Sequence, residues 1–255
     1  MSNFPSHVRV LIIGGGAAGT SALYHLALKG WTDTLLVEAN ELTAGSTWHA
    51  AGNCPNFSGN WGLMRLQRYS TRLYKTLGSA VDYPMDYHVT GAVRLAHTKD
   101  RMEEFRHVTG MARYLDLDFE IVSANELTRQ FPLMETHDLL GGLWDPDDGD
   151  IDPSQLTQAY AKGARDLGAR IERHCRVTGI KRCASGWKVA TEKGEVTAEI
   201  IVNAAGYYAP AIGQMMGREV PCATMAHQYL VTEEIPELTA REQSVPMLRD
   251  PDDSY

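Results

Sequence analysis

The sequence predicts an α/β fold in which a domain with a parallel, dinucleotide-binding sheet is interleaved with a second domain that also contains a β-sheet. Near the N-terminus, the apolar and β-branched run 8–13 meets the glycine-rich turn 14–19, and an apolar stretch over 17–28 follows. This order of strand, tight turn and helix begins a βαβ unit. A second apolar strand, 34–38, then ends on an acid.

The glycine-rich turn has the pattern of a dinucleotide fingerprint. We expect Gly14 to take up unusual backbone dihedral angles, Gly16 to let the backbone approach a pyrophosphate, and Gly19 to allow close packing of helix against strand. The free amides at the helix start, at Ala17 and the following residue, would face the phosphates. Glu38 follows Gly19 by 19 positions, where a carboxylate accepts hydrogen bonds from ribose hydroxyls and repels a 2′-phosphate. The pattern predicts an adenine dinucleotide, and a purely structural glycine-rich turn is the alternative.

The segment after Glu38 distinguishes between the dinucleotides. It contains the run Gly45-Ser46-Thr47-Trp48-His49-Ala50-Ala51-Gly52. This run resembles the flavin family that contains dimethylglycine dehydrogenase, sarcosine dehydrogenase and their oxidase relatives, within the D-amino-acid-oxidase-like superfamily. In that family the histidine of the motif is joined to the flavin, so the resemblance implies FAD bound covalently through His49. Small residues allow close backbone approach, and an imidazole nitrogen is a competent nucleophile. The alternative is a loop histidine that only hydrogen-bonds the cofactor.

Two later segments extend the resemblance. The strand expected at 176–180 is similar to the superfamily strand whose backbone meets the adenine end of FAD near Val177. The buried run 200–203 opens into Ala204-Ala205-Gly206, which is how the superfamily returns to FAD, although a core strand with a glycine stop would look the same. The residues that the resemblance assigns to FAD are Gly14, Gly16, Ala17, Ala18, Gly19, Glu38, Ala39, Gly45, Ser46, Thr47, His49, Ala50, Ala51, Gly52, Val177, Ala204, Ala205 and Gly206.

The resemblance also implies the domain organisation. We assign 1–84 and 150–215 to an FAD-binding domain of the Rossmann-like, glutathione-reductase type, and 85–149 and 216–255 to part of a substrate domain, in a D-amino-acid-oxidase-like arrangement. Family members continue well beyond this length, often into a folate-binding part. We therefore expect the chain to be the N-terminal flavin-domain portion of a longer protein, with tetrahydrofolate as a further ligand where the missing part is present.

Periodicity and capping signals predict the remaining elements. Helices are expected at 61–77, 100–114 and 209–216, after Ser123 and after Asp152; strands are expected at 88–95, 119–122, 170–172 and 223–231, with a hairpin turning at 193–194.

The strand expected at 223–231 carries the candidate catalytic residue. Its run Ala226-His227-Gln228-Tyr229 resembles the family segment whose histidine lies on the substrate side of the flavin. Amine oxidation needs a neutral nitrogen, because a protonated amine cannot release a hydride from its α-carbon. A histidine that titrates near neutrality can take that proton, and a tyrosine hydroxyl can relay it. His227 is therefore the candidate base and Tyr255 the candidate tyrosine; a strand histidine satisfied by hydrogen bonds is the alternative for His227.

Taken together, the resemblance implies an FAD-dependent enzyme that acts on CH–NH bonds. An N-methylated amine or amino acid would give a hydride to flavin N5, and hydrolysis of the iminium would release formaldehyde. Oxygen or another flavoprotein would then accept the electrons. The sequence does not distinguish a dehydrogenase from an oxidase, and it does not identify the amine. Two other readings remain: an FAD amino-acid oxidase with non-covalent flavin, and a non-catalytic nucleotide-binding remnant.

Composition restricts location and partners. A hydrophobic content of 44% over 255 residues allows a large core, and the net charge of −8 disfavours nucleic acid and anionic membranes. No apolar run approaches the roughly 20 residues that span a bilayer, and no signal peptide is evident, so a cytoplasmic location is expected. The four cysteines show no C-x-x-C spacing, and no metal site is predicted. The acidic stretch 145–150 lacks the order of an EF-hand loop and is expected to be a solvated loop.

Overall fold

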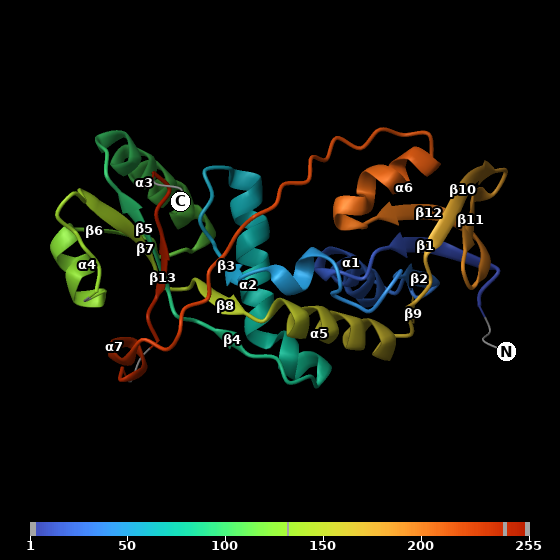
Figure 1. Ribbon diagram of the computed structural model, residues 1–255, viewed down its shortest axis with the longest axis horizontal. Coiled ribbons are helices and arrows are strands. Elements are labelled where there is room, and N and C mark those ends of the chain that lie inside the picture. The colour runs from blue at the N-terminus through green and yellow to red at the C-terminus, as the bar shows by residue number, and fades with distance from the viewer. Residues whose placement is uncertain (1–3, 132, 242–243, 253–255) are drawn as a thin grey trace. The chain divides into compact units, whose positions relative to one another are not determined.

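The computed structural model describes residues 4–131, 133–241 and 244–252. The chain divides into two compact units: unit 1 comprises 1–51, 78–85 and 152–228, and unit 2 comprises 52–77, 86–151 and 229–255. Their helices and strands are labelled in Figure 1. The boundaries fall after residues 51, 77, 85, 151 and 228, whereas the sequence-based domain limits fall after 84, 149 and 215.

Unit 1 is built on a six-stranded sheet with the order β10-β11-β12-β1-β2-β9. Its strands are β1 (His7–Ile13), β2 (Thr34–Val37), β9 (Arg170–Glu172), β10 (Val177–Cys183), β11 (Gly186–Thr191) and β12 (Gly194–Asn203). Neighbours among β12, β1, β2 and β9 run parallel, whereas β10, β11 and β12 pair antiparallel. The predicted hairpin turning at 193–194 is confirmed. An apolar cluster on this sheet contains Val8, Leu11, Ile13, Leu35, Val37, Cys175, Val177, Ile180, Val189, Val196, Ala198 and Ile212.

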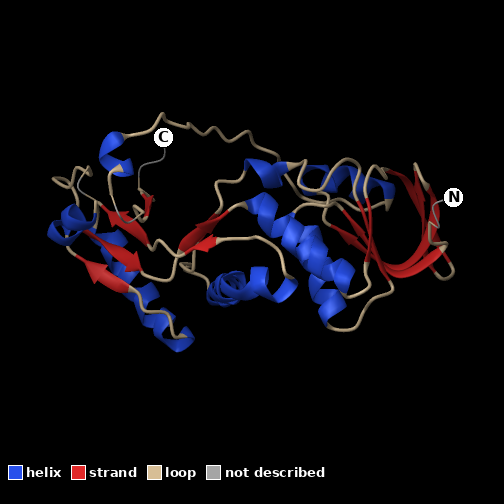
Figure 2. Ribbon diagram, turned by 90° about the horizontal axis from the view of Figure 1, so that it is seen from below, coloured by secondary structure: helices blue, strands red, loops and turns tan. Residues whose placement is uncertain are grey.

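Helices accompany the sheet of unit 1, and Figure 2 distinguishes helices from strands by colour. The helices are α1 (Ala17–Leu28), α5 (Pro153–Asp166), α6 (Ala209–Met215) and the 3-10 turns η1 (Ser46–His49) and η3 (Gly206–Tyr208). The predicted bounds of α1 are confirmed. The Asp152 carboxylate accepts hydrogen bonds from the first amides of α5, as an N-cap does. Close packing of α1 on α5 depends on Gly163, since a Cβ there would lie 2.7 Å from the Tyr24 ring.

Unit 2 contains two small sheets, with strand orders β13-β5-β7-β6 and β3-β8-β4. The strands are β3 (Asn53–Cys54), β4 (Tyr87–His88), β5 (Ala92–Ala96), β6 (Glu120–Val122), β7 (Gly141–Asp145), β8 (Gly149–Ile151) and β13 (Met247–Arg249); the helices are α2 (Trp61–Val81), α3 (Lys99–Ala112), α4 (Ala124–Gln130) and α7 (Pro236–Thr239), with the 3-10 turn η2 (Arg113–Leu115). The strand predicted at 88–95 is divided into β4 and β5, because Gly91 between them has a φ of +72°. Ser123 and Glu126 form a capping box at α4, as predicted.

The acidic stretch 145–150 is not a solvated loop. Asp145 ends β7 and is only 2% exposed, while Asp148 in the following turn is 1% exposed. The Asp145 carboxylate accepts a hydrogen bond from the Asn56 amide, whereas Asp147 faces outward and pairs with Lys75. The expectation was wrong because the stretch forms a tight connection between β7 and β8, which turns alternate acids toward the interior of unit 2.

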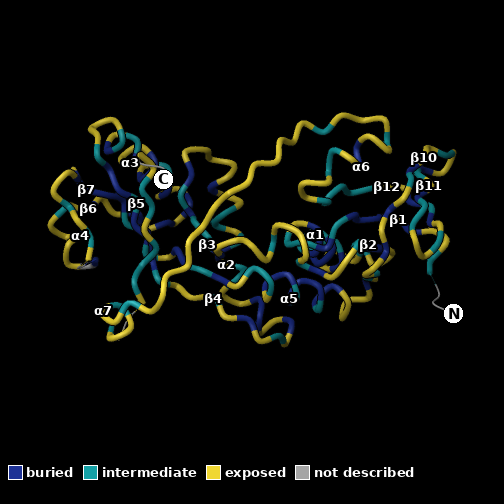
Figure 3. The backbone as a smooth tube through the Cα atoms, viewed as in Figure 1, coloured by how far each residue is buried: buried dark blue, intermediate teal, exposed yellow. Residues whose placement is uncertain are grey.

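The strand predicted at 223–231 is not formed. This segment is extended but belongs to no sheet, and its side chains are exposed, with Met225 at 86% and Leu230 at 83% (Figure 3). A strand needs a neighbour that accepts and donates its backbone hydrogen bonds. Among the described residues no such neighbour lies beside the segment. The prediction of a strand at 223–231 was therefore wrong.

Candidate functional site

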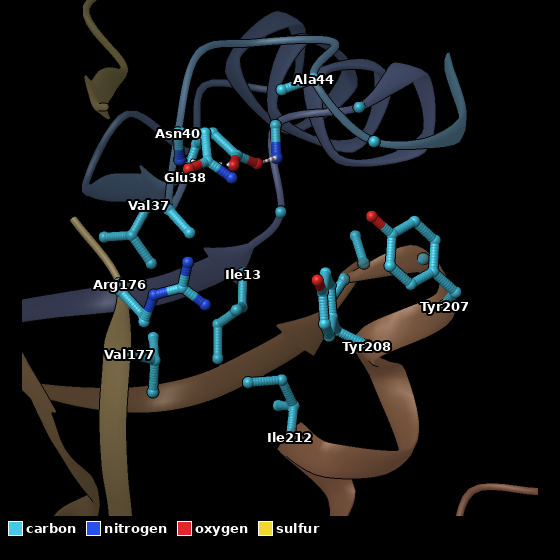
Figure 4. A pocket seen from close by; sticks show the side chains of 18 of the residues that line it. Ile13, Val37, Glu38, Asn40, Ala44, Arg176, Val177, Tyr207, Tyr208 and Ile212 are labelled. Carbon is cyan, nitrogen blue, oxygen red and sulfur yellow. Dashed lines mark hydrogen bonds between the residues drawn. The ribbon is translucent and has the colours of Figure 1, made fainter. Parts of the chain in front are cut away.

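A cavity of about 320 Å³ lies in unit 1 at the carboxyl ends of β1 and β2 (Figure 4), the position where open α/β sheets bind ligands. Its walls come from 13–18, 37–40, 44–47, 175–177 and 204–208, with α6 closing one side. The predicted cofactor residues that line it are Gly14, Gly16, Ala17, Ala18, Glu38, Ala39, Gly45, Ser46, Thr47, Val177, Ala204, Ala205 and Gly206. The predicted residues outside the lining are Gly19, His49, Ala50, Ala51 and Gly52.

The glycine-rich turn is held by contacts that only glycine permits. Gly14 has a φ of +116°, and a Cβ there would lie 2.3 Å from the Ala204 carbonyl oxygen. A Cβ on Gly19 would lie 1.9 Å from the Gly14 carbonyl oxygen, far inside any real contact. The first turn of α1 therefore packs directly on the strand end. This packing brings the backbone at 204–206 to the same edge as the turn.

Glu38 occupies the end of β2 and is half-buried. One carboxylate oxygen accepts a hydrogen bond from the Gly15 amide at 2.7 Å, and the other accepts one from the Asn40 amide at 2.8 Å. Each carboxylate oxygen has a second lone pair. The residue can therefore hold its own loop and still accept hydrogen bonds from ribose hydroxyls in the cavity.

The loop 45–47 is attached to the start of α1 through Thr47. The Ala17 amide donates a hydrogen bond to the Thr47 hydroxyl oxygen at 3.1 Å. The N-cap residue is Gly16, which has no side chain that could accept a hydrogen bond from the helix amides. A Cβ at Gly16 would lie 2.8 Å from the Thr47 hydroxyl oxygen. Thr47 thus caps α1 from a distant loop, at the end of the helix where the dipole favours negative charge.

His49 ends η1, outside the cavity lining. Its ring stacks on Trp48, with ring centroids 3.7 Å apart and planes inclined by 34°, and both residues are exposed. Over the described ranges, the His49 ring has no hydrogen-bond partner. Farther along, Gly52 in unit 2 has a φ of +83°, and a Cβ there would lie 2.0 Å from the Ile151 carbonyl oxygen.

The predicted base His227 does not line the cavity. His227 is exposed in the extended segment, with its Nδ1 3.0 Å from the Gln228 carbonyl oxygen. Tyr255 lies outside the described residues.

Sequence reasoning missed several lining residues, above all two tyrosines and an arginine. Tyr207 and Tyr208 follow the predicted Ala-Ala-Gly run, and their ring centroids are 4.4 Å apart. A Cβ on Gly45 would lie 3.9 Å from the Tyr207 ring, so this ring reaches the loop 45–47. A hydrogen bond with Tyr208 raises the pKa of Tyr207. Their place beside Gly206 was the available signal, whereas Arg176 carried none.

The cavity combines a glycine turn, helix amides and a carboxylate, which suits the phosphates and ribose of an adenine dinucleotide. A family model described as DAO, FAD dependent oxidoreductase, matches residues 9–255. The chain belongs to this FAD dependent oxidoreductase family. The predicted family is thereby confirmed. In the described residues of this family member, no His, Cys, Asp and Glu cluster is placed to hold a metal, and no helix is long and apolar enough to cross a bilayer.

Curated relatives of this FAD dependent oxidoreductase place it more narrowly. It is 41% identical to mouse (Mus musculus) mitochondrial dimethylglycine dehydrogenase over 96% of its length and 32% identical to human (Homo sapiens) mitochondrial sarcosine dehydrogenase over 98%. It is also 30% identical, over 97% of its length, to the mouse mitochondrial pyruvate dehydrogenase phosphatase regulatory subunit. The chain spans 28% of the length of each of these three proteins.

A solved structure supports the fold. L-proline dehydrogenase from P. horikoshii superposes with a TM-score of 0.82 at 21% identity, covering 97% of this chain and 65% of that one. The predicted mixed α/β, D-amino-acid-oxidase-like fold is confirmed by this likeness together with the family match.

Proposed function

We propose that this chain forms the FAD site of an oxidoreductase that oxidises a C–N bond of an N-methylated amine or amino acid of the dimethylglycine or sarcosine type. The observation that carries the proposal is the meeting of the glycine turn, Glu38, the loop 45–47 and the backbone 204–206 around one cavity. The 41% identity to a dimethylglycine dehydrogenase supports the substrate class.

Each wall of the cavity has a role in this proposal. The amides of Gly16, Ala17 and Ala18 receive the pyrophosphate, and Glu38 accepts the ribose hydroxyls. Val177 and Ala39 lie on the adenine side. The loop 45–47 and the backbone 204–206 approach the remainder of the cofactor, and Gly19 keeps α1 close enough for this arrangement. Bound FAD supplies a two-electron acceptor, with the hydride arriving at N5.

His49 is the proposed attachment residue. Its imidazole nitrogen would hold the flavin through a bond to a methyl carbon of the isoalloxazine, which would prevent the cofactor from dissociating. The stacked Trp48 ring limits rotation of the imidazole while leaving its nitrogen edge open. The small residues Ala50, Ala51 and Gly52 let the chain after His49 follow a ligand closely.

His227 and Tyr255 stay predictions as the groups that handle the substrate proton. In this proposal His227 accepts the proton of the substrate ammonium, the free amine releases a hydride, and water hydrolyses the iminium to the demethylated amine and formaldehyde. The electrons pass to oxygen or to another flavoprotein. Where a folate-binding part is present, tetrahydrofolate would take the one-carbon unit. The cytoplasmic location also stays a prediction.

Flavin attachment tests the proposal most directly. The purified chain, denatured with acid and run on a denaturing gel, is expected to show flavin fluorescence, with the flavin mass on the tryptic peptide that contains His49. His49→Ala should abolish this fluorescence, whereas His137→Ala, at an exposed surface histidine, should retain it. A yellow protein that loses all flavin on denaturation would contradict the covalent link, and a colourless one would contradict the FAD site.

Substrate turnover is tested separately. Anaerobic addition of dimethylglycine or sarcosine to the flavin-loaded chain should bleach the flavin absorbance and release formaldehyde. His227→Asn is expected to slow bleaching most above the ordinary pKa of histidine and below that of the substrate ammonium, where a neutral imidazole meets a protonated substrate. Bleaching that is unchanged at every pH would remove His227 from the proposal.

A second candidate function is favoured by the regulatory-subunit relative at 30% identity. In that case the chain is a nucleotide-binding module without redox chemistry. The two candidates differ in a simple observation: the module would bind ADP and remain colourless when expressed with abundant riboflavin, whereas the oxidoreductase would be yellow.

A further inference from the structure

Arg176 is the one cationic side chain among the described residues that line the cavity. It lies between β9 and β10, directly before Val177. Figure 4 shows its guanidinium directed into the cavity beside Val37 and Ile13. The guanidinium makes no hydrogen bond or ion pair within the described parts of the chain.

The backbone around Arg176 is fixed although its side chain is not engaged. The Arg176 carbonyl oxygen accepts a hydrogen bond from the Glu192 amide at 3.1 Å, and the Cys175 amide donates to the Glu38 carbonyl oxygen at 2.8 Å. The two preceding cations behave differently, because Arg173 and His174 both pair with Glu41 on the surface. Arg176 is therefore held at the cavity with its charged group available to a ligand.

The order of the strands indicates which part of a dinucleotide would meet Arg176. The glycine turn follows β1, Glu38 follows β2, and the segment with Arg176 follows β9, which is the next strand in the sheet. If the turn receives the pyrophosphate and Glu38 the ribose, the base lies one strand farther along, at 175–177. The neighbouring walls, Ile13 and Val37, are apolar and suit a flat aromatic ring.

We propose that Arg176 stacks its guanidinium on the adenine ring and so favours an adenine base over a pyrimidine at this position of the site. This inference rests on the proposed function. A planar guanidinium stacks well on aromatic faces. We do not assign the Arg176 guanidinium to a phosphate, because the amides at the start of α1 are the expected phosphate ligands. The Glu38 carboxylate, which binds the Gly15 amide, lies on the cavity wall between that turn and the base position.

Titration of the flavin-free full chain, produced under riboflavin limitation, separates stacking from charge pairing. ADP and UDP share the ribose diphosphate and differ in the base, so calorimetry with both reports on the base contact. Arg176→Ala is expected to weaken ADP binding about tenfold and UDP binding by less than about threefold, since a pyrimidine offers a smaller face. Arg176→Lys, which keeps the charge but not the plane, should lie between the wild type and Arg176→Ala for ADP.

Arg182→Ala is the matched control, because Arg182 lies on β10, the strand that follows Arg176, packs on Trp187 of β11 and does not line the cavity. It should bind ADP as the wild type does. The inference would be overturned if Arg176→Ala lost the same affinity for ADP and for UDP, or lost no affinity for ADP. It would also be overturned if Arg182→Ala lost as much affinity for ADP as Arg176→Ala does. A wild-type chain that binds no ADP would instead contradict the proposed cofactor site itself.

Discussion

The Glu38 carboxylate accepts a hydrogen bond from the backbone amide of Gly15, with the two atoms 2.7 Å apart. This contact joins the end of β2 to the glycine turn that follows β1. Because the other oxygen binds the Asn40 amide, a single side chain orients both loops that border the cavity. The acid is therefore a part of the framework as well as a candidate ribose ligand.

Replacing Glu38 by Gln should weaken FAD binding. The side-chain nitrogen of Gln cannot accept a hydrogen bond from either backbone amide, and a neutral carbonyl is a weaker acceptor than a carboxylate. We expect the affinity of the flavin-free chain for FAD to fall by about tenfold, measured by fluorescence titration. Glu41→Gln is the control, because Glu41 pairs with Arg173 and His174 outside the cavity. Equal affinities for both variants and the wild type would contradict this role.

The Thr47 hydroxyl should contribute to both stability and cofactor retention. Thr47→Val keeps the shape of the side chain but leaves the Ala17 amide without its acceptor. The free energy of unfolding is expected to fall by about 1 kcal/mol, and flavin should be lost at a lower temperature than in the wild type. Thermal unfolding followed by circular dichroism and by flavin fluorescence measures both. Thr76→Val, at an exposed position of α2, should leave flavin release unchanged; an identical flavin-release temperature in Thr47→Val would refute the link between the loop and α1.

Gly19 should tolerate no side chain. A Cβ at this position meets the Gly14 carbonyl oxygen at 1.9 Å, so Gly19→Ala must push α1 away from the strand end. We expect a loss of roughly 1–3 kcal/mol in the free energy of unfolding and weaker FAD binding. Gly59→Ala serves for comparison, since nothing lies within 4 Å of a Cβ there. Chemical denaturation that finds both variants equally stable would show that the close contact is not required.

Asp148 should make the stability of the protein depend on pH. Burial, together with the nearby charge of Asp145, raises the pKa of Asp148 from 3.8 to about 7. The folded state therefore keeps a proton that the unfolded state releases near its own pKa, so the free energy of unfolding falls as the pH rises from about 4 to about 7. The fall attributable to this carboxyl is on the order of 2–4 kcal/mol.

Asp148→Asn should remove that dependence. The Asn oxygen can still accept the hydrogen bond from the Gly149 amide, and the neutral side chain carries no cost of burial at high pH. Urea denaturation at pH 5 and pH 8 should show a smaller difference for this variant than for the wild type, with higher stability than the wild type at pH 8. Asp147→Asn, at an exposed acid, should follow the wild type. A variant that loses stability equally at both pH values would contradict the raised pKa.

The sequence predicted correctly those elements whose ends are determined by residues close together in the chain. The bounds of α1 and the cap of α5 depend on a glycine turn and on Asp152 with its proline, all within a few residues. The capping box of α4 is likewise contained within Ser123 to Glu126. The part of the cavity formed by the turn and Glu38 was visible for the same reason, because the spacing from strand to turn to acid is continuous in the chain.

Features that depend on distant segments were not predictable in this way. Arg176 reaches the cavity only because β9 lies next to β2, and nothing in its neighbours in the chain distinguishes it from Arg173. The burial of Asp148 depends on how the connection between β7 and β8 turns, which acidic composition alone does not reveal. The segment 223–231 shows the reverse case: a local strand pattern without a neighbouring strand stays extended and exposed.

The pairing of β1 with β12 sets the order of events during synthesis. His7 lies opposite Thr197 and Ile13 opposite Asn203, so about 190 further residues must be synthesised after His7 before its partner in β12 exists. The pocket wall at 204–212 appears later still. Such widely separated contacts form slowly, and until then the glycine turn has no opposing surface. The cavity, whose lining extends to Met215, is therefore complete only late in synthesis, and a ligand that needs all of its walls can bind there only after that point.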